Sequence, residues 1–281
     1  MPYADLHMHS TASDGVLSVH TMFDMAREAG LGAVAVTDHD TLEGAKEARA
    51  LAAFYPFHVI AGVELTTAFD GRNIHLLGYF VDPDFDGFEE LFEERRRKRA
   101  KRALAVADNL AAAGYPVSSQ AMLERGGTVN RSLLARMLVE VGEASSVADA
   151  FDRLIGLKSP YYVETSYPDV MDAISLVRAS GGFPFVAHPA LYKVVDLIPR
   201  LADAGLAGVE AFHTEQTPAE SEELVELAGR FGLAVSGGSD WHGDDTHGAC
   251  LGGAGLSRER YEAFCAACGH EEAASSERGR L

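Results

Sequence analysis

Two histidines near the amino terminus have the spacing of metal ligands. His7 and His9 lie two residues apart in the stretch Asp-Leu-His-Met-His-Ser. An extended strand points residues two apart toward the same face, and two imidazoles placed in this way can hold one divalent metal ion. Asp14 follows within one loop and adds a carboxylate. A turn accounts for Ser-Asp-Gly at 13–15, but it does not account for the paired histidines.

Further nitrogen and oxygen ligands follow the predicted strands. Residues 33–36 run directly into Thr-Asp-His-Asp, and residues 58–63 run into Glu64. In folds with parallel strands and outer helices, functional residues gather at the carboxyl ends of the strands. The candidate ligands are His7, His9, Asp14, His39, Glu64, His75, His188, Asp240 and His242. Imidazole and carboxylate without thiolate suit Mn, Fe or Zn, and so many ligands predict two to three divalent metal ions.

The apolar runs predict an α/β fold. Seven strand-like runs are separated mostly by helical segments, and they centre on Leu6, Val34, Ile60, Leu76, Phe185, Val209 and Val235. This alternation favours parallel strands in a barrel with helices outside. We expect the third strand to end at Glu64 and the fourth to cover residues 73–80, with His75 near its start.

The strand pattern is interrupted between residues 85 and 158. This stretch predicts helices at 88–113, 130–141 and 147–155, and no strand. We interpret 85–158 as an inserted helical cap over the site. Residues 1–84 and 159–270 then form the barrel domain, and 271–281 form a polar tail.

The helical insertion contains the only basic run, at residues 95–102. Four glutamates precede it, and i,i+4 pairs such as Glu94 with Lys98 favour a solvated helix for most of the run. One or two of its arginines are expected to face the site. Arg131 opens a predicted helix, where backbone amides also attract anions, so it is a candidate phosphate ligand. The alternative for Arg131 is an ordinary surface arginine.

Composition narrows the class of protein. The chain has 281 residues, 47% of them hydrophobic, and a formal net charge of −18. Such a charge repels polyanions, so duplex DNA is not an expected partner. There is no apolar run of membrane-spanning length and no leader pattern, and we therefore expect a cytoplasmic protein without membrane partners. Three cysteines argue against a disulfide scaffold. The sequence does not fix the oligomeric state.

Five short motifs together resemble one family. Asp-Leu-His-Met-His-Ser, Thr-Asp-His-Asp, Gly-Val-Glu, Ala-His-Pro and Ser-Asp-Trp-His occur in this order between residues 5 and 242. They are similar to the successive motifs of the PHP (polymerase and histidinol phosphatase) phosphoesterases. The resemblance implies a distorted seven-stranded β/α barrel with a trinuclear metal site. It implies one metal held by His7, His9, Glu64 and Asp240, a second by Glu64, His75 and His188, and a third by Asp14, His39 and His242. Several members of the family have histidine where this chain has Asp14.

The insertion, Asn130-Arg131 and the segment 208–213 resemble the branch that acts on 3′,5′-nucleotide bisphosphates. We therefore expect a phosphomonoesterase acting on a small phosphorylated nucleotide, in which a metal-activated hydroxide attacks phosphorus. The expected catalytic residues are Glu64, His213 and Asp240. The expected substrate-binding residues are Asn130, Arg131, His213 and His247.

Three other functions stay open at this stage. A 5′-to-3′ exonuclease on short oligonucleotides would use the same metals on a diester, and a histidinol-phosphate phosphatase would use them on another monoester. A catalytically silent metal-binding scaffold is the alternative from a different class. The presence of a ligand at every motif position counts against the silent scaffold.

Overall fold

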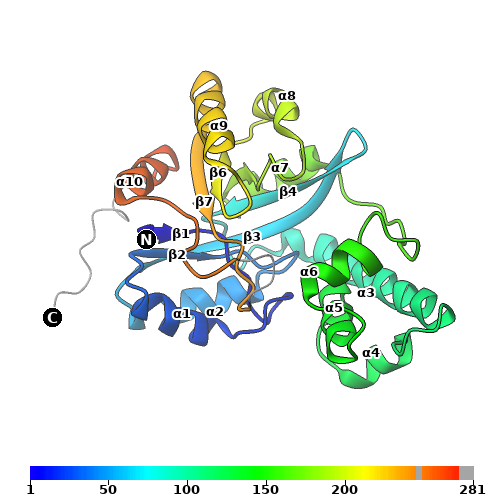
Figure 1. The fold of residues 1–281 in the computed structure, drawn as a ribbon. Coiled ribbons are helices and arrows are strands. Elements are labelled where there is room, and N and C mark those ends of the chain that lie inside the picture. The colour runs from blue at the N-terminus through cyan, green and yellow to red at the C-terminus, as the bar shows by residue number, and fades with distance from the viewer. Residues whose placement is uncertain (245–248, 272–281) are drawn as a thin grey trace. The chain divides into compact units, whose positions relative to one another are not determined.

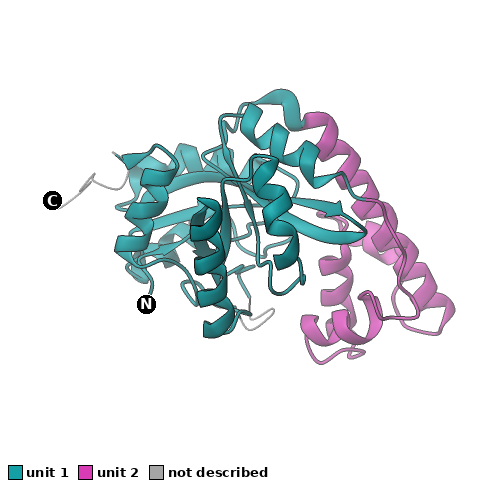
Figure 2. Cartoon of the chain, turned by 90° about the horizontal axis from the view of Figure 1, so that it is seen from above, with its two compact units in different colours: residues 1–88, 167–244, 249–281 teal, residues 89–166, 245–248 magenta. Residues whose placement is uncertain are grey.

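The computed structural model describes residues 1–244 and 249–271. These residues form two compact units (Figure 2). The barrel unit contains Met1–Phe88, Tyr167–Asp244 and the segment that begins at Ala249. The helical unit contains Glu89–Ser166.

Seven strands form one sheet in the barrel unit, in the same order as in the sequence (Figure 1). The first and last strands are joined by backbone hydrogen bonds from Leu6 N to Gly237 O (3.2 Å) and from Asp240 N to His7 O (2.9 Å). The sheet is therefore nearly closed into a barrel, and the prediction of a seven-stranded α/β barrel is confirmed. The strands are β1 (Ala4–Asp5), β2 (Ala33–Val36), β3 (His58–Phe69), β4 (Arg72–Tyr79), β5 (Phe183–Val186), β6 (Gly208–His213) and β7 (Ala234–Gly238).

The expectation of an all-parallel barrel is wrong for β4, which pairs antiparallel with both β3 and β5. Strand β3 does not stop at Glu64 but continues to Phe69. The two-residue turn Asp70-Gly71 follows, with φ of 49° and 73°, which is the left-handed backbone of a tight hairpin. The start of β4 consequently lies where the parallel strands end, and His75 pairs with Thr66 two residues beyond Glu64.

Helices cover the outside of the barrel because each has one apolar face. Helix α1 (Val19–Glu28) buries Met22 and Phe23, and α9 (Pro218–Phe231) begins with a capping box in which Thr217 and Glu220 bond reciprocally. The other elements of this unit are α2 (Glu43–Leu51), η1 (Ala52–Phe54), η2 (Asp86–Phe88), α7 (Val170–Ala179), η4 (Val195–Leu197), α8 (Ile198–Asp203) and α10 (Arg258–Ala267), besides α1 (Val19–Glu28) and α9 (Pro218–Phe231).

The helical unit has an apolar core of its own, in which Val106, Leu110, Leu134 and Leu138 are fully buried. Its elements are α3 (Glu89–Ala112), α4 (Ser119–Arg125), α5 (Arg131–Glu140), α6 (Val147–Ala150) and the π-helical turn η3 (Phe151–Ile155). Helix α4 was not predicted, because its seven residues bury only Met122 and leave no clear periodicity. No helix in the described part of the chain is long and apolar enough to cross a membrane.

Candidate metal centre

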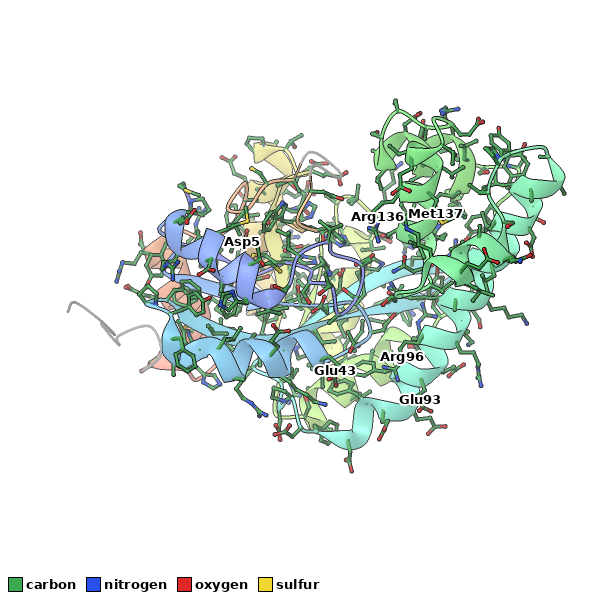
Figure 3. The ribbon with its side chains drawn as sticks, turned by 90° about the horizontal axis from the view of Figure 1, so that it is seen from below. Asp5, Glu43, Glu93, Arg96, Arg136 and Met137 are labelled. Atoms are coloured by element: carbon green, nitrogen blue, oxygen red, sulfur yellow. The ribbon has the colours of Figure 1, made fainter. Side chains whose placement is uncertain are left out.

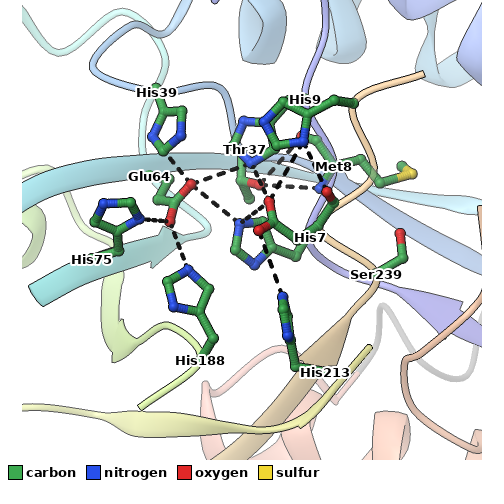
Figure 4. Close-up of polar contacts among 12 residues, drawn as sticks. His7, Met8, His9, Thr37, His39, Glu64, His75, His188, His213 and Ser239 are labelled. Atoms are coloured by element: carbon green, nitrogen blue, oxygen red, sulfur yellow. Dashed lines mark hydrogen bonds and ion pairs between the residues drawn. The ribbon is translucent and has the colours of Figure 1, made fainter. Parts of the chain in front are cut away.

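A single buried carboxylate lies at the centre of the ligand cluster in the barrel unit. Glu64 presents one oxygen to three histidines and the other oxygen to two more (Figure 4). Oε2 lies 3.2 Å from each of His7 Nε2, His9 Nε2 and His39 Nδ1, whereas Oε1 lies 2.7 Å from His75 Nδ1 and 3.3 Å from His188 Nε2. Burial alone would raise the pKa of Glu64, but the neighbouring histidines hold it well below its usual range.

Asp240 supplies a second carboxylate from the residues that follow β7. Its Oδ1 lies 2.9 Å from His9 Nε2 and 3.4 Å from His7 Nε2. The Asp240 backbone has a φ of 56°, and His188 has a φ of 29°. Two of the ligand candidates thus occupy the left-handed region that non-glycine residues rarely adopt, and such strain persists where the surrounding structure enforces a functional geometry.

A third group forms around Asp14. Its Oδ1 lies 3.4 Å from His242 Nε2. The other ring nitrogen of His242 donates to the backbone carbonyl of Asp240 at 2.9 Å, which leaves Nε2 to face Asp14. The ring of His9 stacks on the ring of His242, with centroids 4.3 Å apart, and Asp14 is buried.

The donor atoms fit divalent metal ions. Within each of three overlapping groups, the ligand atoms lie within 4.8 Å of one another. Both ring nitrogens of His9 and Oδ1 of Asp240 are buried without a hydrogen-bond partner, although His9 Nε2 and Asp240 Oδ1 are near neighbours. Ligand atoms that converge on a shared ion have this arrangement, since a buried polar atom otherwise finds a partner. The three groups are His9, Asp14, His39 and His242; His7, His9, Glu64 and Asp240; and His39, Glu64 and His75.

Glu210 is a functional candidate that the sequence analysis did not identify. It is fully buried in β6, and its Oε1 accepts a hydrogen bond from His7 Nδ1 at 3.0 Å. Its Oε2 accepts the backbone N–H of His188 at 2.9 Å. Burial would raise the pKa of Glu210, but His7 lowers it. Such a carboxylate fixes which imidazole nitrogen faces a metal. The signal in the sequence was a single acid inside the apolar run 208–212.

Two buried aspartates hold the loops that carry the ligands. Asp38 accepts hydrogen bonds from Ser10 N at 2.7 Å and from Ser13 Oγ at 2.5 Å, and so fixes the loop between His9 and Asp14. Asp5 accepts hydrogen bonds from Ser239 N and Gly252 N, both at 2.9 Å.

Barrel closure at this end requires a glycine. A Cβ atom on Gly238 would lie 2.3 Å from the Cβ atom of His7, closer than two such carbons can approach. Glycine therefore allows β7 to lie beside the residues that carry the first ligands.

His213 ends β6 with its side chain buried beside the cluster. Its Nδ1 accepts the backbone N–H of Glu215 at 3.2 Å, so the neutral ring carries its proton on Nε2. Nε2 lies 3.6 Å from Asp240 Oδ2. Burial would lower the pKa of His213, but Asp240 and Glu210 raise it.

Two of the remaining predicted site residues, Asn130 and Arg131, belong to the helical unit. Asn130 caps α5, its side chain accepting the N–H of Leu133 at 2.8 Å. The Arg131 guanidinium donates to the carbonyl of Ile155 and lies 5.3 Å from the ring centroid of Phe151. Both belong to the helical unit, and their contact with substrate stays a prediction. His247 lies outside the described residues.

Comparison with known proteins identifies the family. The model of the PHP domain matches residues 5–179. A 5′-3′ exoribonuclease of Haemophilus influenzae is 35% identical over 244 residues, which cover 85% of this chain and 89% of that protein. A 3′,5′-nucleoside bisphosphate phosphatase of Chromobacterium violaceum is 29% identical over 260 residues, which cover 90% and 91%. The crystal structure of a metal-dependent phosphoesterase from Bifidobacterium adolescentis superposes with a TM-score of 0.85 at 28% identity and covers 94% of this chain and 96% of that one. The chain therefore belongs to the PHP domain family of phosphoesterases.

Proposed function

We propose that this phosphoesterase is a metal-dependent phosphatase acting on 3′,5′-nucleotide bisphosphates. The observation that carries ester hydrolysis is the set of overlapping ligand groups around Glu64 and Asp240. Divalent ions bound there supply a nucleophile at neutral pH and neutralise charge on the phosphoryl oxygens. The residues proposed to hold them are those that the family resemblance assigns, including His188, which contacts Glu64 but lies outside the three groups.

The protein's own side chains have three tasks in this proposal. Glu64 and Asp240 provide the negative charge that keeps several cations close together. His213 directs its Nε2–H toward the side of the cluster where Asp240 lies, and there it orients a phosphoryl oxygen or protonates the leaving oxygen. Glu210 keeps His7 and the His188 backbone in place.

The bisphosphate proposal is supported by the distribution of charge along the chain. Residues 89–166 hold 12 of the 24 lysines and arginines but only 11 of the 42 acidic residues. The helical unit therefore lacks the strong negative charge of the remainder of the chain. A second phosphate on the substrate, bound by cationic side chains, would add binding energy that positions the first phosphate for attack.

The cations that we propose for such a phosphate lie on two helices. Arg95, Lys98 and Arg102 recur on one face of α3, and Arg131 opens α5, where the helix dipole favours an anion. Figure 3 shows two more arginines on the same helices, Arg96 on α3 and Arg136 on α5. The pair Glu94–Lys98 forms at 2.5 Å, yet Arg95 and Arg102 are buried, so the basic run is not uniformly solvated.

A 5′-to-3′ exoribonuclease is the second candidate, favoured by the 35% identity to an enzyme of that name. The two candidates are chemically close. A nucleoside 3′,5′-bisphosphate and the first nucleotide of a 5′-phosphorylated RNA both carry phosphate on each side of one ribose. They differ in whether the hydrolysed bond is a monoester or a diester.

A kinetic comparison decides between them. We would measure kcat/KM with adenosine 5′-phosphate, adenosine 3′,5′-bisphosphate, histidinol phosphate and a 5′-phosphorylated dinucleotide. The bisphosphate is expected to exceed the monophosphate by roughly ten- to a hundredfold, because one charge-assisted contact contributes about 1.5–3 kcal/mol. Arg131→Ala should remove this advantage and leave the monophosphate unaffected.

Arg125→Ala is the matched control, since Arg125 lies in the same unit and pairs with Glu140 on the surface. If the dinucleotide is the best substrate, the exoribonuclease is the better assignment. Equal rates for the bisphosphate and the monophosphate would indicate a simple nucleotidase. Preference for histidinol phosphate would move the assignment to that branch, and no hydrolysis by the metal-loaded protein would indicate a silent scaffold.

A further inference from the structure

Tyr192 lies in a tight turn directly after the ligand candidate His188. Backbone hydrogen bonds close this turn from Leu191 N to His188 O (3.1 Å), from Lys193 N to Ala190 O (3.1 Å) and from Val194 N to Pro189 O (3.0 Å). The Tyr192 side chain is half-buried. The turn therefore holds Tyr192 close to the metal-ligand cluster within the barrel unit.

The Tyr192 side chain contacts two of the proposed ligands at once. Its hydroxyl oxygen lies 3.3 Å from His75 Nε2. Its ring stacks on His188 with centroids 5.0 Å apart and an interplanar angle of 28°, and its centroid lies 4.8 Å from that of the His75 ring. The tyrosine thus links a ligand candidate on β4 with another that follows β5.

The orientation of His75 differs from that of most other ligand candidates. His7, His9 and His188 direct Nε2 toward Glu64. His75 directs Nδ1 toward it at 2.7 Å, as His39 does at 3.2 Å. The ring nitrogen that binds a metal must be unprotonated. In neutral His75 the proton is then on Nε2, where the oxygen of Tyr192 can accept it.

We propose that Tyr192 is a positioning residue of the metal centre. It accepts the Nε2–H of His75 and so fixes the tautomer in which Nδ1 binds the metal. Its ring sets the angle between the imidazoles of His75 and His188, which the proposed function assigns to the same ion. The inference rests on the metal assignment in that proposed function, and it does not depend on which phosphate ester is the substrate.

Tyr192→Phe isolates the hydroxyl, because the ring and its stacking are retained. Tyr55→Phe is a matched control. Tyr55 is also half-buried, lies in the same unit, and places its hydroxyl 3.2 Å from Asp24 Oδ1, which belongs to none of the ligand groups. Each variant thus loses the hydrogen bonding of one phenolic hydroxyl, but only Tyr192→Phe loses a bond to a proposed ligand.

The test is a titration of the metal-free proteins with Zn²⁺ against a competing chromogenic chelator. Tyr192→Phe should bind one of its ions about ten- to a hundredfold more weakly than the wild type, and Tyr55→Phe should bind all of its ions normally. The urea midpoints of the two metal-free variants should match. Nitrogen chemical shifts of the zinc-loaded wild type should show His75 metallated at Nδ1 and protonated at Nε2.

The titration uses no substrate, so a failed substrate assignment leaves it intact. Unchanged zinc affinity in Tyr192→Phe, or metallation of His75 at Nε2, would overturn the proposal. A loss of stability in the metal-free Tyr192→Phe with normal zinc binding would replace it by a packing role. A wild type that binds fewer than two zinc ions tightly would overturn both this inference and the multi-metal assignment.

Discussion

The barrel unit and the helical unit place their charged side chains differently. In the barrel, Glu64 and Glu210 are fully buried and their neighbours are histidines. In the helical unit the buried charged side chains are two arginines, Arg95 and Arg102, whereas ion pairs such as Arg125–Glu140 lie near the surface, with 43% and 52% of their side chains exposed. Burying a charge without a partner costs several kcal/mol, whereas an exposed pair contributes little. The buried carboxylates of the barrel, which lie beside histidines, therefore mark the candidate site of chemistry.

The two units also differ in what their cores contain. Apolar side chains from neighbouring helices fill the core of the helical unit, and local contacts are enough to build it. The barrel combines apolar clusters with a polar end where residues far apart in sequence meet, such as His7, Glu64 and Glu210. We therefore expect substitutions at the polar end of the barrel to change the reaction rate, and substitutions in the helical unit to change substrate choice or stability.

Glu64→Gln tests the largest expected effect. It should lower kcat by a factor of ~10² to 10⁴ or more, because the carboxylate meets five histidines and single catalytic groups contribute on this scale. The metal content after dialysis, measured by elemental analysis, should fall as well. Chelation of the wild type should abolish activity, and readdition of metal should restore it.

The control for this variant is Glu140→Gln, which removes the same charge from the helical unit and should leave kcat unchanged. If Glu64→Gln kept about half of the activity at saturating metal, the distinction between the two units would fail. A fully active wild type with at most one metal ion per chain would contradict the multi-metal assignment.

Most of the candidate ligands could be placed from sequence because they belong to short motifs next to apolar runs. His39 and Glu64 could be placed from sequence since a buried strand leads directly to each. The direction of β4 was not predicted, because the hairpin depends on the positive φ values of Asp70 and Gly71 rather than on hydrophobic periodicity. Motif spacing therefore locates ligands better than it determines strand direction.

The contacts of the supporting residues and of the helical unit could not be predicted from the sequence. Glu210 and Tyr192 act through contacts between distant segments. The only local signal for Glu210 is an acid inside an apolar run, and nothing local distinguishes Tyr192 from an ordinary turn residue. The sequence placed Arg131 at a helix start correctly, but it did not show that the guanidinium contacts Phe151 and the carbonyl of Ile155. Side-chain direction is a tertiary property, and substrate contacts depend on it.

In the metal-free protein, the stability of the barrel unit should depend on pH through its buried histidines. Burial would lower the pKa of His9, but Asp240 and Glu64 outweigh it and raise that pKa to about 10. A raised histidine pKa stabilises the folded state fully below the unfolded value of about 6.5, and this contribution is lost as the pH rises toward 10. The free energy of unfolding should therefore fall between pH 6.5 and 8.5, by on the order of 1–3 kcal/mol.

The single tryptophan gives this titration a local probe. Trp241 is buried in the barrel unit beside the ligands, so its fluorescence follows urea unfolding of that unit. His9→Gln should flatten the pH dependence of the urea midpoint. Burial raises the pKa of Cys268 to about 12, so the ionisation of this thiol in the unfolded chain also lowers the free energy of unfolding at high pH. Ending the titration at pH 8.5 keeps this second effect small. A midpoint that rises with pH would contradict the proposed origin of the shift.

Arg125→Ala should have the smallest effect, although it breaks a two-point contact with Glu140. About half of each side chain is exposed, so water and salt already screen the pair. Circular dichroism of urea unfolding should show a loss of less than about 1 kcal/mol, and a double-mutant cycle with Glu140→Ala should give a coupling of about 0.2–1 kcal/mol. Zinc affinity and kcat should stay at wild-type values, because the pair belongs to none of the ligand groups. A coupling above about 2 kcal/mol would mean that a surface ion pair of the helical unit stabilises the fold as strongly as a buried pair does. A fall in zinc affinity would mean that the metal centre depends on the helical unit, and the contrast between the two regions would no longer hold.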